Sequence, residues 1–498
     1  VAAQNGPAAT LLVAAMGEAM KASTPMVALV QDVGRDLTDK NAFQEYDHIA
    51  LFAGVTKWCK VVNVAARVED YIDMAFTMAT SGRPGPVALM LPADMLLEQA
   101  APSRRSACVG EFPLDRAVAP MRRIREAARL IAQAQRPVVI AGGGVHLSGA
   151  HDALAALQQT AHLPVATTMM GKGSVADTHA LTIGVVGAAM GVNSPTRYQR
   201  ELITEADVVL LVGNRTNQNG TDSYQLYPRD ARYIHIDIDS LEIGRNYEAF
   251  RLQGDARETL LALNEALEDE DLSLRAAQRQ AVEARIEQGR QKYRAEAAAV
   301  LQSPASPIRP ERLMTELDAL LQPTDIVVSD ASYSSFWTVN YLRARRPGQR
   351  FLTPRGMAGL GWGLPMALGA RVADPHATIY CLSGDGGFGH VWSELETARR
   401  MKLKVILMVL NNSILGFSKH ADNVRFGTHS TAVNFTSVDH CAVARGAGCH
   451  AIHVDDPDQI RAALQAAQHH DGTTLIEIKC DDNAFPPFTN YADLDLHV

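Results

Sequence analysis

The chain has 498 residues, of which 47% are hydrophobic and 20% are charged, and its formal net charge at pH 7 is −8. This length suggests about three domains, and the apolar content is typical of folded globular domains rather than of a disordered chain. The negative charge, without runs of basic residues, argues against nucleic acid as a main partner, and no stretch approaches the roughly 20 apolar residues of a membrane helix.

The first segment, residues 1–100, alternates helical and strand-like stretches. It opens on Val1-Ala2-Ala3, which reads as the end of a strand running into a Gly6-Pro7 turn, so we expect its opening part to be missing from this sequence. The patterns that follow predict a helix over 11–22, a strand over 25–30, a helix over 61–80 and a strand over 86–92. Residues 101–120 lack periodicity and are predicted to be a surface linker.

The second segment, residues 121–267, is predicted to be a Rossmann-like domain. Its predicted strands cover 137–140, 208–212 and 233–239. The first of these strands runs into Gly142-Gly143-Gly144, which is either a nucleotide-binding loop or a strand-to-helix turn without a ligand. Residues 268–308 then predict a solvated helix and a linker.

The third segment, residues 309–498, repeats the same alternation. Strands are predicted over 326–328, 378–382, 405–410 and 474–478. Strands that alternate with helices favour parallel sheets covered by helices. We therefore predict an α/β fold with three doubly wound parallel-sheet domains, bounded at 1–100, 121–267 and 309–498.

Two polar residues follow neighbouring predicted strands in the third segment. The strand over 378–382 runs into Ser383-Gly384-Asp385-Gly386-Gly387, and the strand over 405–410 runs into Asn411-Asn412. The carboxyl ends of parallel strands are where open α/β sheets bind ligands. A carboxylate and an amide oxygen can hold Mg²⁺ while phosphates fill its other positions, and the glycines let the backbone approach a phosphate.

This arrangement resembles the Gly-Asp-Gly…Asn-Asn motif of thiamine-diphosphate enzymes. The resemblance implies Mg²⁺ bound by Asp385, Asn412 and the backbone carbonyl of Ile414. It also implies cofactor contacts from the neighbouring residues of both turns, namely Gly384, Gly386, Gly387, Leu415 and Gly416.

Residues 356–365 are similar to the loop beneath the cofactor in acetolactate synthases. The resemblance places Gly359 at the cofactor and Leu360 at the bulky apolar position that folds the cofactor into a V shape; the alternative is an apolar turn residue in the core. Asp330-Ala331-Ser332-Tyr333-Ser334 resembles the second diphosphate turn of the family, with a small-residue helix cap as the alternative.

The first and middle segments also resemble acetolactate synthases, at Gly6-Pro7, 23–27, 42–45, 55–57, 83–87, 164–168 and 235–239. The resemblance implies active-site roles for Gln44 and Lys57, which we treat as catalytic candidates. For Lys57 the alternative is an ordinary surface charge. His390 and His420 are either active-site residues or ordinary helix or core residues.

Three departures from the family pattern affect the predicted activity. No glutamate of this sequence fits the role of the cofactor-activating one, which would lie about 20 positions before Val1 and contributes about 10²–10⁴-fold as a general acid–base group. Ala421 stands where the family's biosynthetic enzymes carry a tryptophan that narrows the acceptor pocket. In 213–220 only Arg215 resembles the arginine-rich FAD loop, so FAD is a weaker expectation than thiamine diphosphate and Mg²⁺.

The resemblance implies thiamine-diphosphate-dependent decarboxylation of a 2-oxo acid such as pyruvate, followed by ligation to a second carbonyl. The alternatives are a 2-oxo-acid decarboxylase or C–C lyase that does not ligate, and a non-catalytic homologue that binds the cofactor. The family further implies a homodimer or homotetramer.

The spacing of the six cysteines indicates the redox state of the cell compartment in which the protein is expected. None belongs to a C-x-x-C pair, so their spacing gives no support for zinc binding or thioredoxin-like chemistry. Reduced thiols in the cytoplasm are expected. The cysteines are Cys59, Cys108, Cys381, Cys441, Cys449 and Cys480.

Overall fold

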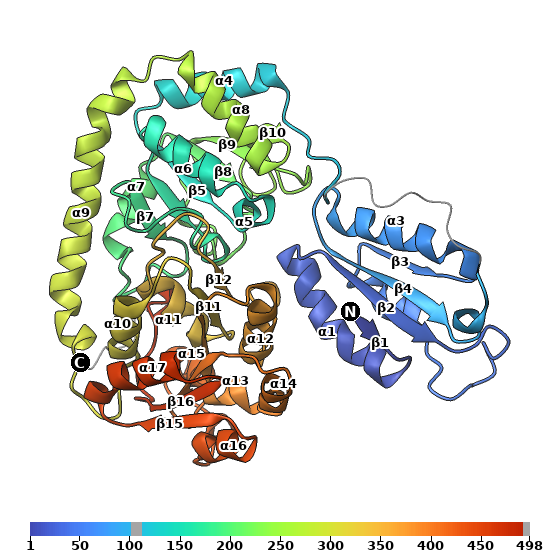
Figure 1. Cartoon of the computed structure of the whole chain (residues 1–498). Helices are drawn as coiled ribbons and strands as arrows, with labels where there is room; N and C mark the ends of the chain where they lie inside the picture. The colour runs from blue at the N-terminus through green and yellow to red at the C-terminus, as the bar shows by residue number, and fades with distance from the viewer. Residues whose placement is uncertain (101–111, 492–498) are drawn as a thin grey trace. The chain divides into compact units, whose positions relative to one another are not determined.

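The computed structural model describes residues 1–100 and 112–491, and its strands form three sheets (Figure 1). Every strand pair of these sheets is parallel. The chain divides into two compact units, Val1–Ala117 with Pro354–Ala358, and Val118–Thr353 with Gly359–Val498. The predicted α/β class with three parallel sheets is therefore confirmed.

The first unit contains a four-stranded sheet of order β1-β2-β4-β3. Helices α1 and α2 pack on one face of this sheet and α3 packs on the other. The strands are β1 (Ala2–Ala3), β2 (Met26–Asp32), β3 (Trp58–Val61) and β4 (Pro86–Pro92), and the helices are α1 (Pro7–Ala22), α2 (His48–Ala53) and α3 (Val68–Thr80).

Two predictions for this unit were wrong in detail. Helix α1 begins at Pro7 instead of residue 11, because proline is well suited to the first turn of a helix. The helix predicted over 61–80 is instead strand β3 followed by α3, since the four residues of β3 are too few to show a period.

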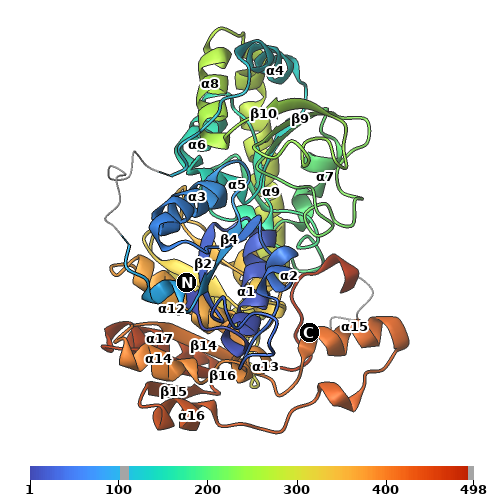
Figure 2. The same ribbon diagram turned by 90° about the vertical axis from the view of Figure 1, so that its right-hand side faces the viewer.

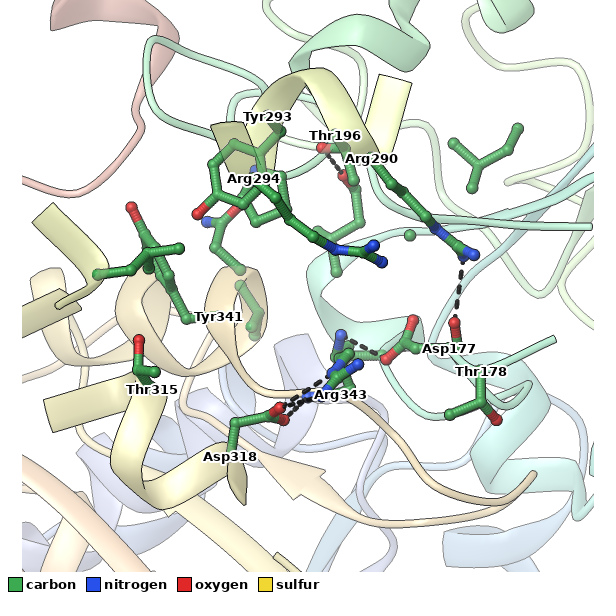
Figure 3. Close-up of a pocket in the computed structure, with 18 of the residues that line it drawn as sticks. Asp177, Thr178, Thr196, Arg290, Tyr293, Arg294, Thr315, Asp318, Tyr341 and Arg343 are labelled. Atoms are coloured by element: carbon green, nitrogen blue, oxygen red, sulfur yellow. Dashed lines mark hydrogen bonds and ion pairs between the residues drawn. The ribbon is translucent and has the colours of Figure 1, made fainter. Parts of the chain in front are cut away.

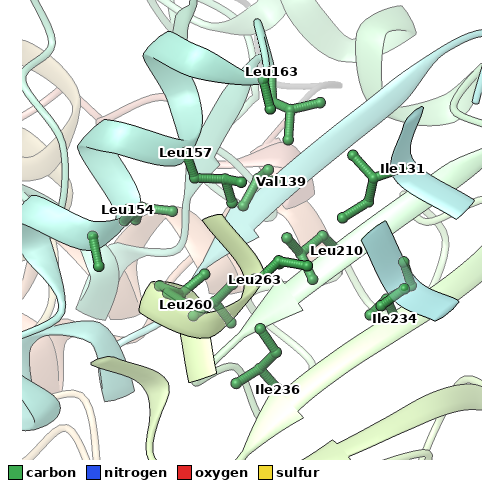
Figure 4. Close-up of a cluster of buried hydrophobic side chains, with 14 of the residues drawn as sticks. Ile131, Val139, Leu154, Leu157, Leu163, Leu210, Ile234, Ile236, Leu260 and Leu263 are labelled. Carbon is green, nitrogen blue, oxygen red and sulfur yellow. The ribbon is translucent and has the colours of Figure 1, made fainter. Parts of the chain in front are cut away.

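The second unit contains a six-stranded sheet of order β10-β9-β8-β5-β6-β7. A core of aliphatic side chains from the sheet, α4, α6 and α8 fills one of its faces (Figure 4). The strands are β5 (Pro137–Ala141), β6 (Val165–Thr167), β7 (Thr182–Val185), β8 (Val208–Val212), β9 (Arg232–Asp237) and β10 (Ala249–Gln253). The helices are α4 (Met121–Gln133), α5 (Gly144–Ser148), α6 (His151–Thr160), α7 (Arg200–Thr204) and α8 (Ala256–Glu268).

The same unit holds a second six-stranded sheet, of order β12-β11-β13-β14-β16-β15. Helices α10, α11 and α17 cover one face, and α12, α14 and α16 cover the other. The strands are β11 (Ile326–Ser329), β12 (Phe351–Leu352), β13 (Ile379–Gly384), β14 (Ile406–Asn411), β15 (His450–Val454) and β16 (Thr474–Lys479). The helices are α10 (Pro310–Leu320), α11 (Tyr333–Tyr341), α12 (Gly363–Ala373), α13 (Asp385–Gly389), α14 (Glu394–Arg400), α15 (Gly416–Phe426), α16 (His440–Gly446) and α17 (Ile460–His469).

Helix α9 (Ser273–Leu301) links the two sheets of the second unit and confirms the helix predicted within 268–308. Figure 1 shows it running from the helices of the middle sheet to α10. The predicted linker over 101–120 lies partly outside the described residues, which omit 101–111. None of the helices described is both long and apolar enough to cross a bilayer.

Candidate functional site

Most of the predicted cofactor residues follow three adjacent strands of the third sheet. Strand β13 pairs in parallel with β11 on one side and with β14 on the other. Their carboxyl ends therefore lie at one edge of the sheet, and Asp330, Asp385 and Asn412 come directly after them. The sheet topology places all three polar residues where α/β sheets bind ligands.

Asp385 is a buried carboxylate held by backbone donors. Its oxygens accept hydrogen bonds from the N–H of Gly386 at 2.7 Å and from that of Ser413 at 2.6 Å. No ion pair of the described chain includes Asp385. Burial raises the pKa of its carboxyl above the usual value, although the backbone donors act in the opposite direction. A cation at this site would offset the desolvation of the charged form, so the residue fits a metal ligand.

The turn after β14 brings Asn412 and Ile414 next to Asp385. Ser413 has a φ of 56°, in the left-handed region, and the Asn412 side-chain oxygen accepts a hydrogen bond from the Ile414 N–H at 3.3 Å. An isolated bridge pairs Ile414 with Asn434. Its two hydrogen bonds end on the carbonyls of Ser413 and Val433, so neither uses the Ile414 carbonyl.

Asp330 fixes the loop that carries the predicted wedge residue. Its carboxylate accepts hydrogen bonds from the N–H groups of Gly361 and Trp362, both at 3.0 Å, and from the Ser383 hydroxyl at 3.1 Å. The same carboxylate accepts from the Ala331 N–H at 2.8 Å. One buried group therefore ties the loops after β11 and β13 to the loop before α12.

Leu360 lies in this loop, one residue before Gly361. Its side chain remains 37% exposed. A core residue would be buried, so the exposure favours an apolar group that faces a ligand over the alternative of a core turn residue. Gly359 has no room for a side chain, because a β-carbon there would lie 2.5 Å from Nε1 of Trp362.

Tyr333 connects the turn after β11 to the turn after β14. It begins α11, after Ser332, whose φ of 63° is in the left-handed region and whose side chain makes no capping hydrogen bond, so the helix-cap alternative does not account for it. A β-carbon on Gly416 would lie 3.0 Å from the Tyr333 ring. The Tyr333 hydroxyl lies 2.6 Å from Nδ1 of His420, and the two rings are stacked.

His420 is buried, so it is not a helix-surface residue. An active-site residue and an ordinary core residue remain as its two alternatives. Burial lowers its pKa to about 4, so the imidazole is neutral at pH 7 and its Nδ1 can accept the hydrogen bond from Tyr333. His390, by contrast, is exposed. Ala421, the residue after His420, is half-buried and belongs to the same helix, α15.

The other predicted cofactor residues also lie at these turns. A β-carbon on Gly386 would lie 2.8 Å from the Leu415 side chain, whereas one on Gly384 would meet nothing within 4 Å. Ala331 and Ser334 are both buried. The structure thus brings together all the cofactor residues that the sequence predicted in the second unit.

The two catalytic candidates lie in the first unit, in different local environments. Gln44 has a φ of 61°, and its carbonyl accepts a hydrogen bond from the Asn5 side chain at 3.3 Å. The Lys57 ammonium donates to the carbonyls of Met78 at 2.6 Å and Ser81 at 2.8 Å, at the end of α3. These contacts are those of a side chain that caps the C-terminus of a helix. The catalytic roles of both residues stay predictions.

Sequence reasoning missed a buried histidine in this unit. The Gly6 N–H donates to Nε2 of His48 at 3.1 Å, so Nδ1 carries the proton and donates to Asp32 at 3.2 Å. The sequence gives little indication of this contact, because His48 lies more than 40 residues after Gly6 and belongs to no motif with it. The pair orders the turn between β1 and α1.

The glycine triplet after β5 is explained by backbone packing. A β-carbon on Gly142 would lie 2.2 Å from the Gly213 carbonyl oxygen, and the Gly144 N–H donates to that oxygen at 3.1 Å. The close approach of two loops therefore requires glycine here, which favours the turn without a ligand over a nucleotide loop.

A cavity of about 580 Å³ lies elsewhere in the second unit, against α9, α11 and β7 (Figure 3). Its charged groups include the ion pairs of Lys172 with Asp177 at 2.6 Å, of Arg343 with Asp318 at 2.7 Å and of Arg294 with Glu287 at 3.3 Å. None of the predicted site residues lines it. We therefore place the candidate site at the strand ends and not in this cavity.

Comparison with known proteins agrees with this geometry. Three thiamine pyrophosphate enzyme family models match the chain: the N-terminal TPP binding domain over 1–51, the central domain over 124–263 and the C-terminal TPP binding domain over 330–478. The last of these matches contains Asp330, Asp385 and Asn412.

Curated relatives match along nearly the whole chain. The probable acetolactate synthase large subunit of Methanococcus aeolicus is 31% identical over 96% of this chain and 81% of its own length. Its counterpart in Methanocaldococcus jannaschii is 31% identical over 96% and 80%. The acetolactate synthase isozyme 2 large subunit of Escherichia coli is 28% identical over 97% and 85%. The chain belongs to the thiamine-diphosphate-dependent enzymes of the acetolactate synthase large-subunit family.

Proposed function

We propose that this enzyme catalyses thiamine-diphosphate-dependent decarboxylation of a 2-oxo acid such as pyruvate and ligates the remaining acyl unit to a second carbonyl. The family membership supports this activity, as do the converging turns at the carboxyl ends of β11, β13 and β14. The observation that carries the proposal is Asp385, a buried carboxylate that receives only backbone hydrogen bonds at the strand ends.

We propose that Mg²⁺ binds to Asp385, to the Asn412 side-chain oxygen and to the Ile414 carbonyl. All three are oxygen donors, the type that Mg²⁺ prefers. The Ser413 N–H bond to Asp385 holds the two turns together, and the bridge at Ile414 leaves its carbonyl available. The diphosphate of the cofactor would complete the coordination of the metal.

When bound, thiamine diphosphate supplies an electron sink for the carbanion left by the loss of CO₂. The chain's own residues bind and orient it. Leu360 would contact the cofactor, and Asp330 fixes the Leu360 loop through Gly361 and Trp362. The hydrogen bond between Tyr333 and His420 holds together the turns that would bind the diphosphate.

The carboligation step depends on the acceptor, and here Ala421 supports a second candidate. An alanine leaves more room than an indole, so a wider acceptor region fits either a larger acceptor or a reaction that ends without ligation. The second candidate is therefore a 2-oxo-acid decarboxylase or C–C lyase. Product analysis with pyruvate separates them, because ligation yields acetolactate and simple decarboxylation yields acetaldehyde.

FAD binding and the association of subunits are two further points of the proposed function. Arg215 supports an FAD site in the middle domain, and the absorbance spectrum of the purified protein tests it through the flavin band. We propose a homodimer or homotetramer in the cytoplasm, in which Gln44 and Lys57 contribute to the active site. Free thiols at all five described cysteines support a reducing compartment.

Calorimetric titration with thiamine diphosphate and Mg²⁺ tests the site. We expect saturable binding that requires Mg²⁺ and is lost in Asp385→Ala. The matched control is Asp471→Ala. Asp471 is exposed and precedes the amino end of β16, whereas the candidate site lies at the carboxyl ends of the strands in the same sheet. Equal cofactor affinity in the two variants would overturn the assignment.

A further inference from the structure

Three metal-ligating side chains meet at the edge of the third sheet, outside the cofactor site. The Cys441 Sγ, a His453 ring nitrogen and a Glu477 carboxylate oxygen all lie within 4.8 Å of one another. They belong to α16, β15 and β16, which are adjacent in both views (Figures 1 and 2). No other group of this kind occurs among residues 1–100 and 112–491.

The fold explains why these distant residues converge. Strands β15 and β16 pair in parallel with His453 directly opposite Glu477, so both side chains project on the same face. Helix α16 starts after Asp439, whose side chain caps it by accepting a hydrogen bond from the Ala442 N–H. The first turn of this helix places Cys441 on the buried side, packed against the sheet.

The two oxygens of Glu477 have different surroundings. Oε1 accepts hydrogen bonds from the Asn411 side chain at 2.7 Å and from Nδ1 of His440 at 2.9 Å. Oε2 faces Nδ1 of His453 at 3.1 Å. Asn411 and His440 therefore orient the carboxylate in the way that outer-shell partners orient a metal ligand, while Oε2 faces the His453 ring.

We propose that Cys441, His453 and Glu477 form a binding site for Zn²⁺ or another transition-metal ion with the same ligand preference. The ligands would be Sγ, Nδ1 and Oε2, with water as the fourth group of a tetrahedral site. A thiolate, an imidazole and a carboxylate are together a zinc ligand set, whereas Mg²⁺ prefers oxygen. The site is thus chemically distinct from the one at Asp385.

Access and protonation are consistent with binding. The His453 side chain is 50% exposed, so an ion can enter from solvent. Burial alone would raise the pKa of Glu477, but hydrogen bonds from His440, Asn411 and His453 lower it to about 2, so the carboxylate is ionised. Burial raises the pKa of Cys441 to about 11, so the ion would displace the thiol proton on binding.

Cobalt titration of the whole chain, stripped with chelator and kept in excess Mg²⁺ and thiamine diphosphate, tests the proposal. We expect one equivalent of Co²⁺ to give a thiolate-to-cobalt charge-transfer band and tetrahedral ligand-field bands, both abolished by one equivalent of Zn²⁺. In Cys441→Ser the charge-transfer band should disappear, and Zn²⁺ affinity should fall by at least about 10–100-fold, the loss that even an outer-shell change causes.

Two further variants keep the test decisive. His453→Asn changes a half-exposed residue, so it should fold normally and still weaken Zn²⁺ binding; thiamine diphosphate affinity should not change. Cys449→Ser is the matched control, because Cys449 is a buried cysteine on the same face of the sheet that does not belong to the cluster, and its cobalt spectrum should match the parent. Absence of the charge-transfer band in the parent, or its persistence in Cys441→Ser, would overturn the proposal, leaving only a hydrogen-bond network around Glu477.

Discussion

Asp330 occupies the space that a side chain on Gly387 would need. A β-carbon at Gly387 would lie 2.1 Å from the Asp330 carboxylate oxygen. The same oxygen accepts hydrogen bonds from the Gly361 N–H and the Ser383 hydroxyl. The second glycine after Asp385 is therefore required by this buried carboxylate, which also fixes the Leu360 loop.

Gly387→Ala should destabilise the protein and weaken cofactor binding. The added methyl group cannot fit without moving Asp330, and overpacking of this kind costs about 1–3 kcal/mol. Denaturant unfolding and thiamine diphosphate titration measure the two effects. Gly389→Ala is the matched control, because a β-carbon there meets nothing within 4 Å. Equal stability of the two variants would show that Asp330 does not occupy this position.

Leu360→Ala should lower turnover much more than stability. The side chain is partly exposed, so its truncation should cost less than about 1 kcal/mol of unfolding free energy. If it supports the cofactor, misplacement of the reacting groups should lower kcat by about 100-fold. Steady-state kinetics with pyruvate measures this loss, and Val372→Ala, at an exposed position of α12, is the control. Unchanged kcat would contradict the wedge role.

Lys57→Met should destabilise the first unit. Its ammonium bonds two carbonyls at the end of α3, and hydrogen bonds to charged groups contribute about 1.5–3 kcal/mol. Lys60→Met, at an exposed position of β3, should have little effect. Thermal unfolding compares the two. A loss of kcat/KM in Lys57→Met with no change in stability would favour the catalytic role instead.

Acidification should destabilise the protein through His420. Burial lowers its pKa from 6.5 to about 4, so between these values the unfolded chain binds more protons than the folded one, and stability falls as the pH falls. From pH 7 to pH 5 this group should account for about 2 kcal/mol. Urea unfolding at both pH values measures the loss, which should be smaller in His420→Gln.

Other buried histidines also lower the stability of the folded state as the pH falls. The contribution of His420 is therefore obtained from the difference between the parent protein and His420→Gln. Burial lowers the pKa of His146 to about 3 and that of His235 to about 4. Both remain in the variant and contribute equally to both curves. A pH dependence unchanged by His420→Gln would mean that His420 is solvated in the native state.

The strands that carry the candidate cofactor site could be predicted because they are continuous apolar runs followed by polar residues. The runs before Asp385 and Asn412 are buried on both faces, so their composition alone identifies them. The edge strands β12 and β15 were missed, because two-residue and half-exposed strands have no such signature.

The roles of side chains at the site were harder to predict than their positions. The sequence placed Asp330 in a diphosphate turn but could not show that it bonds Gly361 and Trp362, which lie more than 30 residues away. In the same way, Cys441, His453 and Glu477 have no motif spacing, and only the pairing of β15 with β16 brings them together.

The parallel pairing of β11, β13 and β14 also constrains how the protein folds. Each pairing closes a long loop, and topologies dominated by non-local contacts fold slowly. The three proposed Mg²⁺ ligands are brought together only after these crossovers have formed, so metal and cofactor should associate late during refolding. Once bound, they would stabilise the finished sheet by mass action, and a chain made without thiamine would be more vulnerable to proteolysis.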